Sequence, residues 1–414
     1  ASKIFVSGRT LNILGSGNFT NNATNTLDLS GTSLVNLNGA TVAHVRQGTK
    51  VDDDVAAGKG IFSNSDSTIT TLLMDASAAL VGTATTTVTN AFNVGANTLN
   101  IGSTGTLDCG GNVTLDNADS RLLFSAAGSV DGAVVVSATP NAGKGIDVDV
   151  SGATLNGNLT LDSSGNINIA TNTTFFYGGA TVDISGNDSL TLTGAGATSV
   201  LQGANNLKIG ATGNLSIGGN VRLNMPISLA GTGTNTIDLN SNTLTYTDAS
   251  ASKIFVSGRT LNILGSGNFT NNATNTLDLS GTSLVNLNGA TVAHVRQGTN
   301  VDDNVAAGKG ISSNSDSTIT TLLLDASAAL VGTATTTVTN AFNVGANTLN
   351  IGSTGTLDCG GNVTLNNVNS KLLFSAAGSV GGNVVVSATP NAGKGIDVDV
   401  SGATLNGNLT LDSS

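Results

Sequence analysis

The sequence predicts an all-β protein built as a parallel β-helix (β-solenoid) from tandem 250-residue cassettes. Three observations predict this fold. Residues 1–164 recur in register as residues 251–414 with ten differences, short apolar–x–apolar triplets recur throughout, and glycine or asparagine separates them. A fixed period indicates a repeat architecture, and alternation of period two indicates half-buried strands. We therefore divide the chain into a complete cassette, residues 1–250, and a partial second copy, residues 251–414, continuous with the first.

The triplets define the expected strands in chain order. Each is about three to five residues long and lies about six to ten residues from the next, which is typical of an all-β fold. The clearest are at residues 11–13, 27–29, 146–150, 159–161, 167–169, 182–184, 190–192, 237–239 and 244–246. Residues 71–80 (TLLMDASAAL) are the one segment in which we expect one or two helical turns.

A finer repeat within the cassette predicts which side chains point inward. Residues 95–117 align without gaps to residues 203–225, and their polar positions vary while their apolar positions alternate with them. Cys109 aligns with Ile217, so it belongs to the apolar set. The predicted inward side chains in the first segment are Leu99, Ile101, Leu107, Cys109, Val113 and Leu115.

Composition favours a solenoid over other all-β folds. A sandwich or propeller needs aromatic anchors and a closed set of strands, whereas aromatic residues are 3% of this chain and Trp is absent. A parallel β-helix needs small aliphatic side chains inside and Gly or Asn at corners with positive φ; the chain has 54 glycines. With roughly 20–25 residues per coil and a strand spacing of about 4.8 Å, one cassette would form about ten to twelve coils.

Charge and hydropathy exclude several classes of protein. The net charge is −11, whereas nucleic acids and anionic lipids attract basic surfaces. No apolar run approaches the roughly 18–20 residues that span a bilayer. Apolar residues are 39% of the chain, too many for a disordered segment. The sequence therefore predicts a folded, acidic protein with no nucleic-acid partner and no membrane-spanning segment.

The run L-x-I-G-x-T-G-x-L-x-x-G-G-N-V-x-L at residues 99–115, which recurs at 207–223, also carries a family resemblance. It resembles the passenger domains of autotransporters and filamentous-haemagglutinin-type adhesins. The near-verbatim 250-residue unit resembles giant repetitive surface-fibre proteins. The resemblance covers most of the cassette as a style of coil and implies a right-handed parallel β-helix displayed at a bacterial surface. No active-site motif carries over with it.

Candidate chemistry is sparse. His44, with its copy His294, has no HExxH, CxxC or GxSxG pattern beside it, so an edge position is the favoured interpretation. Asp147 and Asp149 would project outward about 7 Å apart, a separation that carboxylate pairs of glycosidases use. Residues 52–54 (DDD) are a candidate Ca²⁺ loop. Because aromatic platforms are scarce and the second copy replaces several acids, we favour solvated acidic loops. We expect no catalytic residue, cofactor or metal site.

Other residues have structural interpretations. Cys109 and Cys359 are equivalent and too far apart for a disulfide, so we expect buried thiols. Thr83, Thr85, Thr87 and Thr89 alternate along one strand, which favours β-branched strand filling over an ice-binding surface. Between copies, Met74→Leu is expected in the core and Phe62→Ser at the surface or in a loop. Glycosylation sequons occur at Asn18, Asn22, Asn112, Asn158, Asn172, Asn187 and Asn214.

The favoured function is a structural, non-enzymatic segment of an extracellular, cell-surface fibre or filament that provides spacing, attachment or a sheath. Partners would be further copies associating end to end, with contact to a cell surface or its glycans. Two alternatives stay open: the stalk of an adhesin whose binding tip lies elsewhere, and a polysaccharide-acting enzyme. Residues 1–19 equal residues 251–269, and residues 408–414 equal residues 158–164, so neither end carries an atypical cap. We therefore expect segments resembling residues 165–250 beyond Ser414 and before Ala1.

Overall fold

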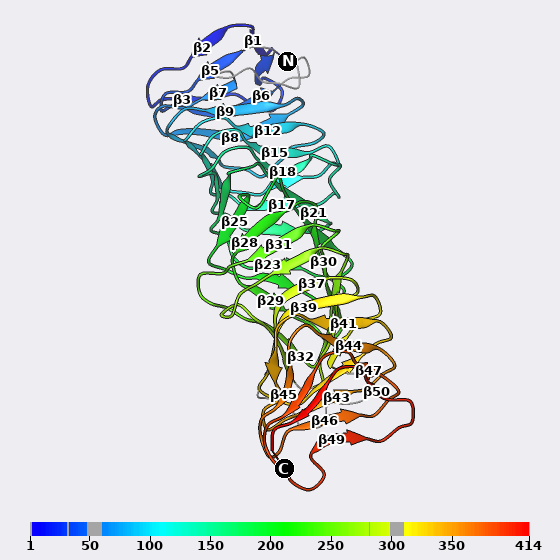
Figure 1. Cartoon of the computed structure of the whole chain (residues 1–414). Coiled ribbons are helices and arrows are strands. Elements are labelled where there is room, and N and C mark those ends of the chain that lie inside the picture. The colour runs from blue at the N-terminus through cyan, green and yellow to red at the C-terminus, as the bar shows by residue number, and fades with distance from the viewer. Residues whose placement is uncertain (1, 31–32, 48–59, 281, 299–309, 414) are drawn as a thin grey trace. The chain divides into compact units, whose positions relative to one another are not determined.

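The structure is a computed structural model that describes residues 2–30, 33–47, 60–280, 282–298 and 310–413. Within these residues the protein is all-β, with parallel strands stacked as a β-solenoid of about 17 turns, and no helix occurs (Figure 1). The predicted all-β, parallel β-solenoid fold is therefore confirmed. The chain forms two compact units, residues 1–184 with 188–207 and residues 185–187 with 208–414, and each is described by itself.

In the first unit each coil carries strands on up to three sides. The first side holds β2 (Thr10–Asn12), β5 (Leu34–Asn36), β7 (Gly60–Phe62), β9 (Ala78–Val81), β12 (Thr98–Ile101), β15 (Arg121–Phe124), β18 (Gly145–Val148), β21 (Gly165–Ile169) and β24 (Ser189–Gly194). The second holds β3 (Asn18–Phe19), β6 (Thr41–Gln47), β8 (Ser67–Met74), β10 (Thr85–Val88), β13 (Thr106–Cys109), β16 (Ser129–Val130), β19 (Thr154–Leu155), β22 (Thr174–Tyr177) and β25 (Val200–Gly203). The third holds β1 (Ile4–Ser7), β4 (Leu27–Ser30), β11 (Phe92–Asn93), β14 (Val113–Leu115), β17 (Val134–Val136), β20 (Leu159–Leu161) and β23 (Val182–Ile184).

The second unit repeats this arrangement, and β26 (Leu207–Ile209) precedes its first full coil. Its first side holds β27 (Asn214–Ile217), β30 (Thr234–Asp238), β33 (Thr260–Leu264), β36 (Leu284–Asn286), β38 (Gly310–Ser312), β40 (Ala328–Val331), β43 (Thr348–Ile351), β46 (Lys371–Phe374) and β49 (Gly395–Val398). Its second side holds β28 (Val221–Asn224), β31 (Thr243–Tyr246), β34 (Asn268–Thr270), β37 (Thr291–Gln297), β39 (Ser317–Leu324), β41 (Thr335–Val338), β44 (Thr356–Cys359), β47 (Ser379–Val380) and β50 (Thr404–Leu405). Its third side holds β29 (Ile227–Leu229), β32 (Ile254–Ser257), β35 (Leu277–Ser280), β42 (Phe342–Asn343), β45 (Val363–Leu365), β48 (Val384–Val386) and β51 (Leu409–Leu411).

Parallel pairing between successive coils sets the side-chain pattern. On the first side, Leu99 pairs with Leu122, which pairs with Ile146, and all three are fully buried. Side chains bond to a neighbouring coil at sequence separations from 18, for Gln47 to Leu29, to 29, for Ser199 to Ala170. This range contains the expected coil length of about 20–25 residues. The core is therefore a column of aliphatic side chains, each stacked on its equivalent one coil away.

The predicted inward set is confirmed. Leu99, Ile101, Leu107, Val113 and Leu115 are at most 2% exposed, and Cys109 is also buried. Met74 and its counterpart Leu324 are both buried, as the conservative exchange indicated. Phe62 is half-buried in β7, where it pairs with Asn36, so it lies in a strand and not in a loop.

Glycine is required where one coil's backbone approaches the next corner closely. A Cβ on Gly157 would lie 1.9 Å from the Gly132 carbonyl oxygen, and a Cβ on Gly132 would lie 2.2 Å from the Cys109 Cβ. Both distances are far inside van der Waals contact, and a side chain at either position would force the coils apart. The same corner therefore excludes a Cβ on successive coils.

The expected helical turns at residues 71–80 are wrong. Residues 67–74 form β8, and residues 78–81 form β9. Val45, Arg46 and Gln47 of β6 pair in register with Leu72, Leu73 and Met74. Because the ladder satisfies the backbone groups of this segment and buries its apolar face, tertiary pairing overrides its local preference for helix.

The boundary between the two sequence copies lies inside the second unit, and strand pairing crosses it. β30 pairs with β33 from Thr234–Thr260 to Asp238–Leu264, and β31 pairs with β34. The Tyr246 and Phe269 rings stack with centroids 6.2 Å apart. Ile254 is fully buried, whereas its counterpart Ile4 is 48% exposed. The last coils of the first copy thus bury the start of the second.

Candidate functional sites on the coil surface

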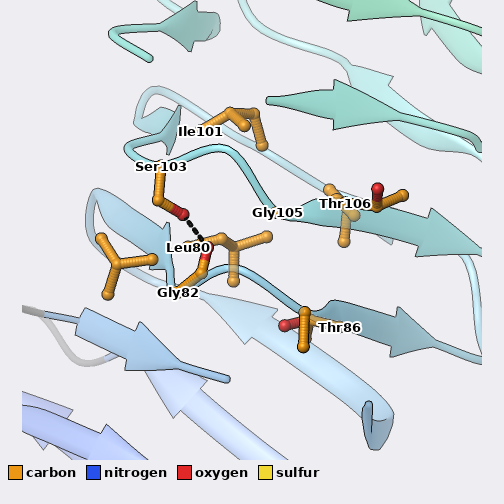
Figure 2. Close-up of a pocket in the computed structure, with 10 residues that line it drawn as sticks. Leu80, Gly82, Thr86, Ile101, Ser103, Gly105 and Thr106 are labelled. Carbon is orange, nitrogen blue, oxygen red and sulfur yellow. Dashed lines mark hydrogen bonds between the residues drawn. The ribbon is translucent and has the colours of Figure 1, made fainter. Parts of the chain in front are cut away.

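The cavities at the corner between the first and second sides are small. One is lined by residues of β9, β10, β12 and β13 and the turns between them, and its equivalent recurs in the second copy. Each has a cavity volume of about 10 Å³, room for about one water molecule and far below the roughly 300–1,000 Å³ of a small-molecule site. Figure 2 shows the Ser103 hydroxyl donating to the Gly82 carbonyl oxygen across this corner. No lining residue is titratable, so the cavity offers hydroxyl and carbonyl contacts without acid–base chemistry.

Asp147 lies on the outer side of β18, and the exposed Asp149 follows the end of that strand. Arg121 of the preceding coil donates from Nε to the Asp147 carboxylate at 2.9 Å and also forms an ion pair with it. Burial and the charge of Asp147 raise the pKa of Asp149, although Arg121 opposes this shift. In the second copy Lys371 pairs with Asp397 at 2.6 Å. The cation–carboxylate contact therefore recurs, with Asp147 and Asp397 each held by a basic side chain of the preceding coil.

His44 is held at the corner within β6. Its backbone N–H donates to the Asn21 Oδ1 at 2.7 Å, and its carbonyl accepts from the Asn21 Nδ2 at 2.8 Å. The ring Nδ1 lies 3.3 Å from the Asn21 carbonyl oxygen, and His294 repeats these contacts with Asn271. The asparagine clamps the strand where it bends, which is a structural role. Nowhere in the described ranges do three His, Cys, Asp or Glu side chains converge on a possible metal position.

The cysteines are buried and carry no activated thiol. Burial, with the charges of Asp108 and Asp131, raises the pKa of Cys109 to about 12. Burial and Asp358 raise the pKa of Cys359 to about 12. Since the thiolate is the reactive form, both side chains act as small apolar groups. The DDD loop at residues 52–54 lies outside the described residues.

The threonine row of β10 continues across coils, which sequence reasoning missed. Thr85 pairs with Thr106, then Ser129, then Thr154, so one outward column carries a hydroxyl on four successive coils. The Thr106 and Ser129 hydroxyl oxygens lie 2.8 Å apart. The column ends where Thr154 pairs with Phe176. Only the coil register reveals this alignment, because the residues are distant in sequence.

Sequence reasoning also missed a charged network on the third side. Asp28 of β4 is buried on the outer side and pairs with Lys3 at 3.1 Å and with Arg46 at 3.5 Å. In the second copy, Asp278 lies 3.5 Å from Lys253 and 3.1 Å from Arg296. Arg46 and Arg296 also contact Asp75 and Asp325, respectively. Sequence carried no distinguishing signal for it, because nearly every residue is equally spaced in the two copies and only the coil register brings these charges together.

The two tyrosines of the chain hold corners. The Tyr177 hydroxyl accepts from the Leu159 N–H at 3.1 Å and donates to the Ala180 carbonyl oxygen at 2.6 Å. The Tyr246 hydroxyl makes the same pair of bonds with Ile227 and Ser252. Each ring is buried while its hydroxyl satisfies two backbone groups.

Comparisons of the chain with protein-family models, with curated proteins and with solved structures find no match. No helix in the described part of the chain is long and apolar enough to cross a membrane. The fold and surface define a parallel β-solenoid whose recurring polar features hold coils together. The resemblance to autotransporter and haemagglutinin-type passenger domains continues to rest on the sequence pattern.

Proposed function

We propose that this chain is a structural segment of an extracellular fibre or filament built from repeated β-solenoid cassettes. The observation that carries the proposal is the stacking at the sequence boundary in the second unit. There, β30 and β31 of the first copy pair in register with β33 and β34 of the second. One cassette can therefore follow another without a linker, which is what an array built for length requires.

The backbone ladder would give such a segment its resistance to force along the axis. Each coil is joined to the next by backbone hydrogen bonds on its sides, so a force along the axis acts on several bonds at once. Side chains reinforce the stack, as in the Arg121–Asp147 pair and the Thr106–Ser129 contact. Because each coil contacts only its neighbours, stability is a sum of local terms and does not limit the number of coils.

The proposal assigns no catalysis to the chain. Arg121 engages Asp147, Asn21 holds the backbone of His44, and burial keeps Cys109 protonated. Asp147 and His44 thus have structural partners on a neighbouring coil, and Cys109 is part of the core. The two corner cavities are too small for a polysaccharide chain.

End-to-end self-association and contact with a cell surface belong to the same proposal. Stacking of one coil on another buries apolar side chains, as the change from Ile4 to Ile254 illustrates. A coil of matching strand pattern in another subunit would bury the same side chains. The acidic net charge of −11 would keep the lateral faces of parallel fibres apart at low salt.

Electron microscopy of the native material tests the proposal. Uniform filaments with the width of a single solenoid are the expected result. Immunogold labelling against residues 165–250 should decorate them periodically along their length, because that segment distinguishes complete cassettes. Short spikes with a distinct head would instead indicate an adhesin stalk. Isolated globular particles inside cells would contradict both the fibre and its extracellular location.

A further inference from the structure

The strongest outward apolar feature recurs at the same place in both copies. Phe5 of β1 is 70% exposed, and Phe255 of β32 is 61% exposed. Val6 and Val256, the next residues in each strand, are buried, so both phenylalanine rings point away from the core. Phe255 has coils of the second unit on its C-terminal side through the pairing of β32 with β35. The ring is therefore exposed on the side of the solenoid and not at an open end of the stack.

Polar groups lie on β32 itself and on the strands that follow it along the ladder. Asp278 is the register partner of Phe255 and is itself paired with Arg296, which is paired with Leu323. Lys253 lies 3.5 Å from Asp278, and Arg296 contacts both Asp278 and Asp325. Ser257 is exposed on the same outward side of β32, and its register partner Ser280 is half-buried. We call Phe255, Lys253, Asp278, Arg296 and Ser257 the ring platform.

The first copy repeats the ring platform residue for residue. Phe5 pairs with Asp28, which pairs with Arg46, and Lys3 and Arg46 both contact Asp28. Ser7 is exposed beside Phe5. The ten differences between the copies leave all these positions unchanged. The arrangement is thus a fixed feature of the cassette start.

Charge and size decide the class of occupant. The platform's two bases, Lys253 and Arg296, are balanced by Asp278 and by Asp325, the second ion-pair partner of Arg296, so the group carries no net charge. The exposed apolar surface of the platform is that of one phenylalanine ring, since the exposed Leu323 lies three strands further along the ladder, and one ring is far less than the roughly 800 Å² that each partner of a stable protein complex buries. A pyranose ring matches the platform, because its C–H face stacks on an aromatic ring while its hydroxyls reach serine, lysine and guanidinium groups at the rim.

We propose that the ring platform is a contact site for a neutral glycan chain, one hexose stacking on Phe255 and an equivalent hexose on Phe5. This inference rests on the proposed surface function and names the chemistry of its partner. The ion pairs hold the charged side chains of the ring platform in place on the strands, so few side chains lose conformational freedom when a glycan binds. A single ring gives weak affinity, and recurrence in every cassette raises it through multivalency.

Affinity electrophoresis of the full 414-residue chain tests the site. The gels contain one of three neutral polysaccharides, hydroxyethyl cellulose, soluble starch or galactomannan, or heparin as the anionic arm. We expect at least one neutral polysaccharide to retard the protein, and we expect the double variant Phe5→Ala/Phe255→Ala to bind it about fivefold more weakly. The control Phe176→Ala removes a 37% exposed phenylalanine elsewhere and should bind like wild type.

Three results would overturn the proposal: no retardation by any of the three neutral polysaccharides, equal retardation of the double variant, or retardation by heparin alone. Circular dichroism of each variant shows whether the coil is retained, since the outward rings are not core residues. Electron microscopy of the double variant separates this inference from the proposed function. If the double variant still forms filaments but is no longer retarded by the glycan, the proposed fibre function holds and the glycan contact is assigned to the ring platform.

Discussion

A methyl group added at Gly157 should separate two coils. The Cβ of Gly157→Ala would lie 1.9 Å from the Gly132 carbonyl oxygen and 2.3 Å from its carbon. Reaching an ordinary contact near 3.4 Å requires a shift of about 1.5 Å at a corner where little can move. The bonds from the Asn156 N–H to the Val130 oxygen and from the Val134 N–H to the Asn158 oxygen, both 2.8 Å, would lengthen with it.

The expected cost follows from these contacts. Overpacking costs about 1–3 kcal/mol, and two weakened backbone hydrogen bonds add about 1 kcal/mol each. Gly157→Ala should therefore lower the free energy of unfolding by about 3–5 kcal/mol. Gly196→Ala is the matched control, because its Cβ meets nothing within 4 Å. That change should be neutral or stabilise by up to about 1 kcal/mol through the unfolded state.

Urea unfolding followed by circular dichroism measures the difference between the two variants. Because a solenoid can unfold in parts, amide hydrogen exchange at Val134 and Val136 should report the local loss around Gly157. The reasoning is refuted if Gly157→Ala and Gly196→Ala unfold at the same urea concentration and exchange these amides at the same rate.

Burial, charge and hydrogen bonding give four further predictions. Iodoacetamide should leave Cys109 unmodified between pH 8 and 10 in the folded chain and modify it rapidly in urea, because its pKa is raised to about 12 by burial; rapid alkylation without urea would contradict its inward position. The raised pKa of Asp149 means that its ionised form is penalised in the folded state, so Asp149→Asn should increase the urea midpoint at pH 7 and lose this advantage as the pH falls through that pKa. Burial opposes ionisation of Asp248, but hydrogen bonds from Ser250 and Ser252 leave its pKa lowered. Asp248→Asn should therefore show the opposite pH dependence, lowering the urea midpoint at pH 7 and lowering it less in acid. Equal pH profiles for the two variants would contradict both assignments. Tyr177→Phe leaves the Leu159 N–H without its bond and should cost about 1–3 kcal/mol in the same urea assay.

The sequence repeat within the cassette shows which structural features periodicity could predict. Residues 207–223 carry the pattern of residues 99–115, and of 349–365 in the second copy. Within the second unit both segments place the same apolar positions inward: Leu215 and Leu357 are buried, as are Val221 and Val363. Strand identity and inward direction follow from local alternation, so sequence alone determined them.

The side that each strand occupies did not follow from the pattern. β27 belongs to the ladder that runs through β30, β33, β36, β38 and β40 to β43, whereas its sequence counterpart is β44. β28 likewise reaches β44 through β31, β34, β37, β39 and β41, although its counterpart is β45. The two similar segments are thus displaced by one side of the coil, since the residues accumulated in intervening turns set the phase.

The candidate functional residues also divide into those whose orientation the sequence determined and those that only the coil register brought together. Sequence determined that Cys109 points inward, that Asp147 and Asp149 point outward and that the first coil of each copy repeats. Only the tertiary structure aligned Thr85 with Thr106, placed Asp278 against Arg296 and turned residues 71–74 into strand. The physical reason is the distance along the sequence over which each effect acts. Alternation acts between neighbouring residues, whereas a ladder joins groups about one coil apart, and its register depends on every turn between them.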